Sequence, residues 1–243
     1  MMELDLTATY ALAVSGGVDS MVMLHKFAST LPRPNFFVVT VNHNIRAEAQ
    51  ADCDFVRDYC KTLNTECRII NIDVPAYSVA HKLSEETAAR ILRYNAFNDL
   101  ACDYVCLAHH LNDNAETVLM HILRGSGARG ATGIRVQNGK YVRPLLDMTR
   151  QQIEQYATEH NVPYVHDKTN DETKYTRNFI RKNILPKLKE VFPAVEQNIV
   201  RFAENIAQDN DFLDSLVDTS NVIYGDGYAK IPTSFAKLPK PLS

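Results

Sequence analysis

Short apolar runs alternate with longer amphipathic stretches between residues 10 and 143. Short runs rich in β-branched residues are typical of buried strands, whereas apolar residues repeated at helical spacing indicate helices. This pattern predicts strands at 10–14, 36–42, 68–73, 104–108 and, more weakly, 140–143. It predicts intervening helices at 19–29, 47–63, 84–100 and 112–124.

Strands that alternate with helices long enough for crossovers form parallel sheets. The sequence therefore predicts an α/β fold, a Rossmann-like doubly wound parallel sheet of about five strands with helices on both faces. A helical segment is expected to follow, because apolar residues recur at helical spacing from 194 to 217.

The pattern changes after Pro144. Thr149 is expected to cap a helix over 150–161, and a polar loop from 166 to 176 precedes another helical stretch. The tail from 220 to 243 resembles the first strands of a further region, of which the sequence contains only the beginning. We predict a catalytic domain at 1–193, followed at 194–243 by a helical linker and the start of a truncated C-terminal region.

The composition is that of an ordinary globular domain, with 45% hydrophobic residues and 26 basic against 29 acidic side chains. The five cysteines include no CxxC pair, which argues against a disulfide scaffold and favours a reducing compartment. No apolar run approaches the roughly 18 residues of a membrane span, and the N-terminus lacks the pattern of a signal peptide. These features predict a cytoplasmic protein that does not bind a membrane.

A glycine-containing hexad directly follows the first strand and directly precedes a helix. Its glycines permit a tight turn and close approach to an anion, while the helix N-terminus and the serine hydroxyls supply hydrogen-bond donors. An aspartate in such a loop points to Mg²⁺ between it and the phosphates. The alternative is a glycine-rich turn with a serine cap. The expected ATP-binding residues of the hexad are Ser15, Gly16, Gly17, Val18, Asp19 and Ser20.

A second glycine-rich segment, GSGARG at 125–130, matches the dinucleotide pattern GxGxxG. It follows a predicted helix and not a strand, so the dinucleotide interpretation fails its context. Ala131 also stands where a P-loop needs lysine. We expect a flexible loop beside the site.

The SGGVDS hexad resembles the loop of the N-type ATP pyrophosphatases, which cleave ATP between the α and β phosphates. Within that superfamily, other segments resemble the tRNA(Ile)-lysidine synthetase family. The likeness extends from about residue 10 to residue 190 and is carried by VNHNIR at 41–46, Glu86 with ARILRY at 89–94, AHHLNDNAET at 108–117 with LRGSG at 123–127, and RNFIR at 177–181 with Leu185-Pro186.

The resemblance implies a ligase that forms a carbon–nitrogen bond. In this family, O2 of the wobble cytidine, C34, in tRNA-Ile with a CAU anticodon attacks the α-phosphate of ATP, and pyrophosphate is released. L-lysine then replaces AMP at C2. The implied substrates are ATP, L-lysine and that tRNA, with Mg²⁺ as the metal ion, and the resemblance leaves a homodimer open.

Two histidines and two acidic residues stand at the end of the fourth predicted strand and in the first turn of the next helix: His109, His110, Asp113 and Glu116. Ligands of open parallel sheets bind at this edge. Asp113 and Glu116 share a helix face and can hold Mg²⁺ or an ammonium group, and His110 can accept a proton from an attacking amine. The alternative is that the acids complement the helix dipole and the histidines are structural.

The expected catalytic residues are therefore Asp19, His110, Asp113, Glu116 and Arg177, and the expected metal ligands are Asp19 and Asp113. The resembled family has HHxDDQxET here, whereas this chain has Asn112 and Asn114 in place of the first Asp and the Gln. We expect altered affinity with unchanged chemistry, and an inactive or specialised copy is the alternative.

Further candidates follow the second strand and lie on basic helices. Asn42 and His43 fit adenosine recognition, the alternative being a loop histidine without a ligand. Basic residues spaced for one helix face can contact tRNA phosphates or leaving pyrophosphate, although solvated surface charges would explain the same spacing. The candidates are Arg90, Arg93, Arg124, Arg177 and Arg181, with Lys174, Lys182, Lys187 and Lys189 near the last two.

Three other functions stay open. A tRNA 2-thiolating enzyme shares the phosphate loop but usually needs CxxC cysteines or a metal cluster. An inactive paralogue would bind ATP without turnover. A small-molecule amidotransferase or synthetase would need a glutaminase domain, for which this chain has no room.

Overall fold

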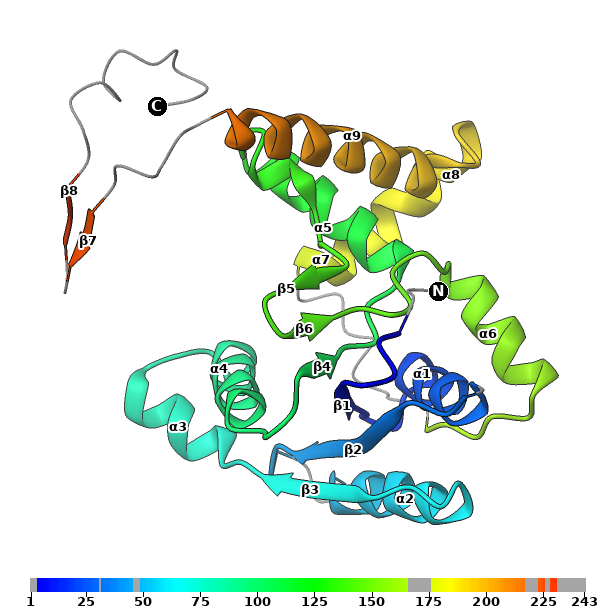
Figure 1. Ribbon diagram of the computed structural model, residues 1–243. Helices are drawn as coiled ribbons and strands as arrows, with labels where there is room; N and C mark the ends of the chain where they lie inside the picture. The colour runs from blue at the N-terminus through cyan, green and yellow to red at the C-terminus, as the bar shows by residue number, and fades with distance from the viewer. Residues whose placement is uncertain are drawn as a thin grey trace. The chain divides into compact units, whose positions relative to one another are not determined.

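The computed structural model describes residues 4–30, 32–45, 49–165, 176–216, 223–225 and 228–230 (Figure 1). The chain forms two compact units. Unit 1 contains 1–114 and 135–178, and unit 2 contains 115–134 and 179–243. The predicted domain boundary at residue 193 stays a prediction. Lys174, Arg46 and the polar loop at 166–175 lie outside the described residues.

Unit 1 is built on a six-stranded sheet with the order β3-β2-β1-β4-β6-β5. All pairs are parallel except β5 with β6, which form a hairpin. The predicted parallel sheet is thus confirmed, with β5 added at one edge. The strands are β1 (Thr9–Ala13), β2 (Asn35–Asn42), β3 (Cys67–Asn71), β4 (Tyr104–Cys106), β5 (Gln137–Asn138) and β6 (Tyr141–Val142).

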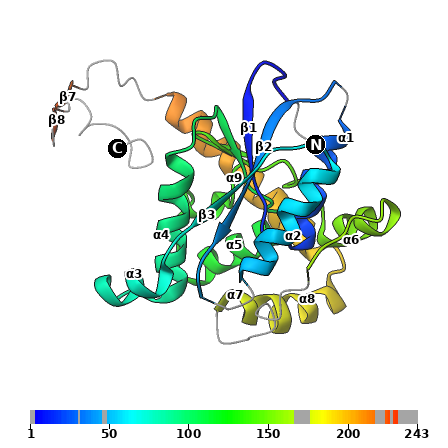
Figure 2. The same cartoon turned by 90° about the horizontal axis from the view of Figure 1, so that it is seen from below.

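Helices cover both faces of this sheet, as the alternation of strand residues requires. Tyr10 and Leu12 of β1 pack in one core with α1, α2 and α6, whereas Ala11 packs in a second core with Phe97 of α4. Figure 2 shows α4 on one side of the strands and α1, α2 and α6 on the other. The helices are α1 (Val18–Ser29), α2 (Ala49–Thr62), α3 (Val74–His81), α4 (Glu85–Asn98), α5 (Leu111–Leu123) and α6 (Arg150–Glu159).

Capping side chains set where several helices begin. The predicted cap of α6 is confirmed: the Thr149 hydroxyl accepts from the Gln152 backbone N–H, and the Gln152 side chain accepts from the Thr149 N–H in return. The sequence analysis did not include α3. Asp73 caps it by accepting from Ala76 N–H at 3.0 Å, so the chain leaves β3 at Asn71, before the predicted strand end.

Unit 2 consists mainly of helices. The last helix forms where it was predicted, and a 2.5 Å ion pair between Lys189 and Glu196 joins it to the helix before it. No helix in the described part of the chain is both long and apolar enough to span a membrane. Besides the end of α5, the elements are a 3₁₀ turn at Gly130–Thr132, the end of α7 (Thr176–Phe179), a π-helical turn at Ile180–Ile184, α8 (Leu185–Val191), α9 (Val195–Ser215), and paired strands β7 (Ile223–Gly225) and β8 (Tyr228–Lys230).

Candidate active site

The predicted phosphate loop connects β1 to α1 at the edge where the parallel strands end. Ser20 Oγ donates to Gly17 O at 2.9 Å and accepts from Ser15 N–H at 3.1 Å, which closes the loop on itself. Gly16 has φ +88°, a conformation that favours glycine, and its carbonyl accepts from Val165 N–H at 2.9 Å. No side chain among the described residues caps α1. The loop therefore presents an uncapped helix N-terminus, which suits an anion.

Asp19 lies in the first turn of α1 and contacts two basic groups of unit 1. Its Oδ2 accepts from Arg150 Nη1 at 2.7 Å, and its Oδ1 lies 3.9 Å from His110 Nε2. The sequence analysis missed Arg150. Its place in the sequence could have identified it. Arg150 is the first residue of the helix that follows the last parallel strand, at the edge of the sheet where ligands bind.

Arg150 is held from several directions. Its Nε donates to Glu154 at 2.7 Å, and its backbone N–H donates to Asn112 Oδ1 at 2.8 Å. The structure thus gives Asn112 a definite contact at the start of α6. An aspartate in its place would also offer an acceptor there, so this contact does not require the carboxylate that the family motif carries.

His110 and Asp113 form a compact pair at the start of α5. His110 is 4% exposed, and its Nε2 lies 3.5 Å from Asp113 Oδ2. The Asp113 backbone N–H donates to His110 Nδ1 at 3.4 Å, so neutral His110 carries its proton on Nε2. That proton faces the carboxylates of Asp19 and Asp113. His110 thus lies where it can contact both carboxylates, and its expected role as a proton acceptor stays a prediction.

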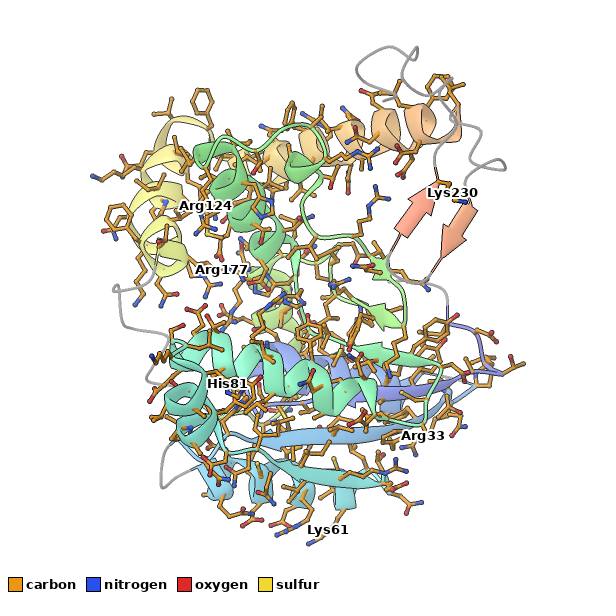
Figure 3. All side chains as sticks on the ribbon, turned by 90° about the vertical axis from the view of Figure 1, so that its left-hand side faces the viewer. Arg33, Lys61, His81, Arg124, Arg177 and Lys230 are labelled. Atoms are coloured by element: carbon orange, nitrogen blue, oxygen red, sulfur yellow. The ribbon has the colours of Figure 1, made fainter. Side chains whose placement is uncertain are left out.

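Asp113 also binds Arg177, which is labelled in Figure 3. Arg177 Nη2 donates to Asp113 Oδ1 at 3.2 Å and to its backbone carbonyl at 3.1 Å. Burial by itself would raise the pKa of the Asp113 carboxyl, but His110 and Arg177 together lower the pKa below its ordinary value. Asp113 is therefore ionised at neutral pH. A carboxyl group must be ionised to bind Mg²⁺ or an ammonium group.

The donor set fits Mg²⁺, which takes oxygen ligands and is commonly bound by one or two carboxylates together with substrate phosphates. Asp19 and Asp113 each direct a carboxylate oxygen to the same imidazole nitrogen. Within the described ranges, no group of three or more His, Cys, Asp or Glu side chains could hold a metal ion alone. Binding of Mg²⁺ by Asp19 and Asp113 therefore stays a prediction.

His109 precedes this pair, and its surroundings are basic. Burial lowers the pKa of its imidazole to about 4, opposed by Asp113 and reinforced by Arg143, Arg177 and Arg93. The imidazole is neutral at physiological pH. Arg90, on the same helix as Arg93, is exposed and lies over the Tyr94 ring at 5.0 Å.

Asn42 and His43 lie at the end of β2, as predicted. Asn42 is 4% exposed: its Nδ2 donates to Gln50 at 3.0 Å, and its Oδ1 accepts from Asn44 N–H at 3.0 Å. These bonds shape the turn before α2. His43 is half-buried beside it, and adenosine recognition by either residue stays a prediction.

Other predicted residues lie in unit 2. Glu116 is 1% exposed, and Arg181 binds both of its carboxylate oxygens, at 2.5 and 2.9 Å. Arg124, labelled in Figure 3, is exposed at the end of α5. This arrangement gives Glu116 a structural ion pair, whereas its expected catalytic role and the phosphate contacts of Arg181 and Arg124 stay predictions.

The GSGARG segment follows α5, as expected, so the dinucleotide motif lacks its strand. His121 Nδ1 lies 2.6 Å from the Gly130 carbonyl. A Cβ on Gly130 would lie only 2.6 Å from Ser126 Cβ. Tight packing at this turn therefore explains the last glycine of the segment without any ligand.

Residues 3–188 match the family model described as the PP-loop domain. A tRNA(Ile)-lysidine synthase from Thermosipho africanus is 46% identical over 235 residues, covering 94% of this chain and 53% of the relative. A tRNA(Ile)-lysidine synthase from Treponema denticola is 41% identical over 215 residues, covering 83% of this chain and 46% of the relative. The chain spans about half the length of these curated relatives.

Among solved structures, the U34-tRNA thiolase NcsA from Methanococcus maripaludis aligns with a TM-score of 0.63 at 19% identity. The alignment covers 84% of this chain and 73% of that chain. At this identity the likeness concerns the fold alone, and it agrees with the doubly wound sheet described above.

Proposed function

The chain belongs to the PP-loop domain family, and from that premise we propose that it is the catalytic part of a tRNA(Ile)-lysidine synthase acting in the cytoplasm. The reaction has two steps. O2 of the wobble cytidine attacks the α-phosphate of ATP and pyrophosphate leaves. The ε-amine of L-lysine then attacks C2 of the adenylated base and AMP leaves. The similarity to curated lysidine synthases over most of this chain supports the proposal.

One observation carries this proposal: the phosphate loop and the His110–Asp113 pair converge. Asp19 of the loop and Asp113 of α5 both face His110 Nε2, at 3.9 and 3.5 Å. The triphosphate bound at the loop would therefore have its reacting end beside a second, acidic group. An acidic group at that point suits the binding of a lysine ammonium and its orientation for attack.

Each residue has a distinct role in the proposed reaction. The loop from Ser15 to Ser20 binds phosphate oxygens, and Asp19 and Asp113 would hold Mg²⁺, which neutralises charge on the phosphates when bound. His110 keeps the two carboxylates oriented through its Nε2 proton. Arg177 lies beside Asp113 and can meet negative charge that develops on the phosphates.

The second step requires the lysine amine to lose protons. The ammonium must become an amine before it attacks, and Asp113 is the carboxylate placed to receive it. A carboxylate with a lowered pKa is a weak base, so we infer that Asp113 binds and positions the ammonium, and that the proton passes to water or to the departing phosphate.

The test is AMP release from ATP with an unmodified tRNA-Ile transcript that carries the CAU anticodon. We expect AMP that depends on both lysine and C34, with a transcript substituted at the wobble position as the control. Mass spectrometry of the nucleosides should show lysidine. Binding of ATP and tRNA without AMP release would refute the synthase activity for this chain.

Asn112→Asp separates an active enzyme from an inactive paralogue. The Asn112 oxygen already accepts from Arg150 N–H, and aspartate preserves an acceptor there. We expect turnover to stay within about threefold of wild type. A gain of a hundredfold would support a degraded site. A product containing 2-thiouridine or 2-thiocytidine, formed with a sulfur donor, would instead identify a thiolating enzyme.

A further inference from the structure

A cluster of arginines surrounds His109 in unit 1. Arg93 of α4, Arg143 after β6 and Arg177 of α7 all lie close enough to His109 to affect its imidazole electrostatically. We call these three side chains the arginine cluster. The arginines come from separate elements, so the fold itself gathers three positive charges around one imidazole.

The cluster has more positive charge than nearby carboxylates neutralise. Asp113 pairs with Arg177 at 3.2 Å. No carboxylate in the described part of the chain pairs with Arg93 or Arg143. Burial lowers the pKa of both guanidinium groups, and both remain charged because arginine is not deprotonated in proteins. Partly buried charges without a carboxylate partner are costly, and such charges commonly mark a ligand site.

Two buried nitrogen atoms of the cluster and its histidine also lack a hydrogen-bond partner among the described residues. Arg143 Nη1 donates to the Arg135 carbonyl at 2.8 Å, but its Nε contacts no hydrogen-bond acceptor among the described residues. His109 Nδ1 is likewise buried without a partner there. Neutral histidine can donate from Nδ1, so both atoms can bind an anion. Native proteins satisfy nearly all such groups, which makes two neighbouring exceptions informative.

The elements that carry the cluster are held rigidly. The Tyr94 and Tyr141 rings pack edge to face at 5.0 Å between α4 and β6, and the Tyr141 hydroxyl donates to Asn98 at 2.6 Å. Tyr94 also interacts with the Arg143 guanidinium. These contacts join the two elements that carry Arg93 and Arg143, and Tyr94 also fixes the position of the Arg143 guanidinium.

The sheet order indicates which anion fits. Along the carboxyl edge, the predicted adenosine residues follow β2, the phosphate loop follows β1, His109 follows β4 and Arg143 follows β6. The cluster thus lies on the side of the phosphate loop away from the adenosine residues. In the proposed reaction the molecule that attacks ATP is RNA, and we place it on that side of the phosphate loop.

We propose that Arg93, Arg143 and His109 form a binding site for an RNA backbone phosphate next to the nucleotide that is modified. The proposal rests on the proposed function and adds Arg143 and His109 to the residues that bind tRNA. Guanidinium groups bind phosphate oxygens in a fixed geometry, and the phosphate would complete the hydrogen bonding of Arg143 Nε and His109 Nδ1.

The test compares binding of the unmodified tRNA-Ile transcript and of ATP to the complete chain, without turnover. For Arg143→Gln we expect about tenfold weaker tRNA binding and a salt dependence of log K lower by about one, because one phosphate contact is lost. Affinity for a fluorescent ATP analogue should be unchanged. Arg57→Gln is the matched control, since Arg57 lies on α2 and forms surface ion pairs with Asp54 and Asp58 of the same helix.

Arg143→Lys guards against misfolding, because it keeps the charge and loses only the planar donor set. We expect it to retain the salt dependence and to recover only part of the affinity. Weaker ATP binding with unchanged tRNA binding would overturn the proposal and assign the site to the nucleotide phosphates. Unchanged binding of both, or no RNA binding by wild type, would also overturn it. If the tRNA affinities of wild type and variants are as expected but wild type releases no AMP, only the proposed synthase activity is refuted.

Discussion

Arg181→Met should strongly destabilise the protein, because it leaves the Glu116 carboxylate buried without its cation. Glu116 is 1% exposed, and Arg181 binds both of its oxygens. Removing one partner of a buried ion pair costs about 3–5 kcal/mol. The Arg181 side chain is 38% exposed, so water screens the pair and the lower end, about 3 kcal/mol, is expected. For a chain of this size, that loss lowers Tm by about 6–12 °C.

Urea unfolding followed by circular dichroism measures this loss. Arg201→Met is the matched control, because Arg201 is exposed and donates to Asn198 on the surface of α9. It should change stability by less than about 0.5 kcal/mol. The double variant Glu116→Gln/Arg181→Met should recover at least about half of the loss, because no buried charge remains. A loss below about 1 kcal/mol for Arg181→Met, combined with reduced turnover, would refute the structural role and favour a phosphate contact.

Three further predictions concern unit 1. Asp19→Asn should reduce AMP formation by at least about 100-fold while tRNA affinity stays unchanged, and normal AMP formation would exclude Asp19 as a metal ligand. The pKa of His109 falls from 6.5 to about 4 on folding, so its neutral form stabilises the protein above pH 6.5 and this contribution is lost as the pH falls toward 4. In wild type, the free energy of unfolding should fall by about 3 kcal/mol between pH 6.5 and pH 4 because of His109, and His109→Asn should lack this part of the loss in urea titrations at successive pH values. An unchanged pH profile would contradict the buried neutral state. Thr149→Ala should cost about 1 kcal/mol of unfolding free energy, whereas Thr149→Ser should retain it; equal stability of the two variants would argue against the capping box.

The amino-acid sequence by itself determined the local structure of this protein. The apolar runs predicted the parallel strands, and Thr149 predicted the start of α6. The hexad from 15 to 20 follows β1 as expected and extends into the first turn of α1. These features depend on neighbouring residues, through side-chain periodicity, capping bonds and the conformational freedom of glycine. The residues responsible are neighbours in sequence, so these elements can be predicted without knowing the fold.

The tertiary structure alone decided which charges meet. Arg150 contacts Asp19 across 131 positions in sequence, and Arg177 contacts Asp113 across 64. From sequence, the acids and most of the bases have separate expected roles, yet the fold pairs several of them and turns His110 Nε2 toward two carboxylates. Pairing and burial depend on which strand ends and helices the sheet order brings together. Charge spacing along the chain does not encode that order, so only the folded chain specifies the site.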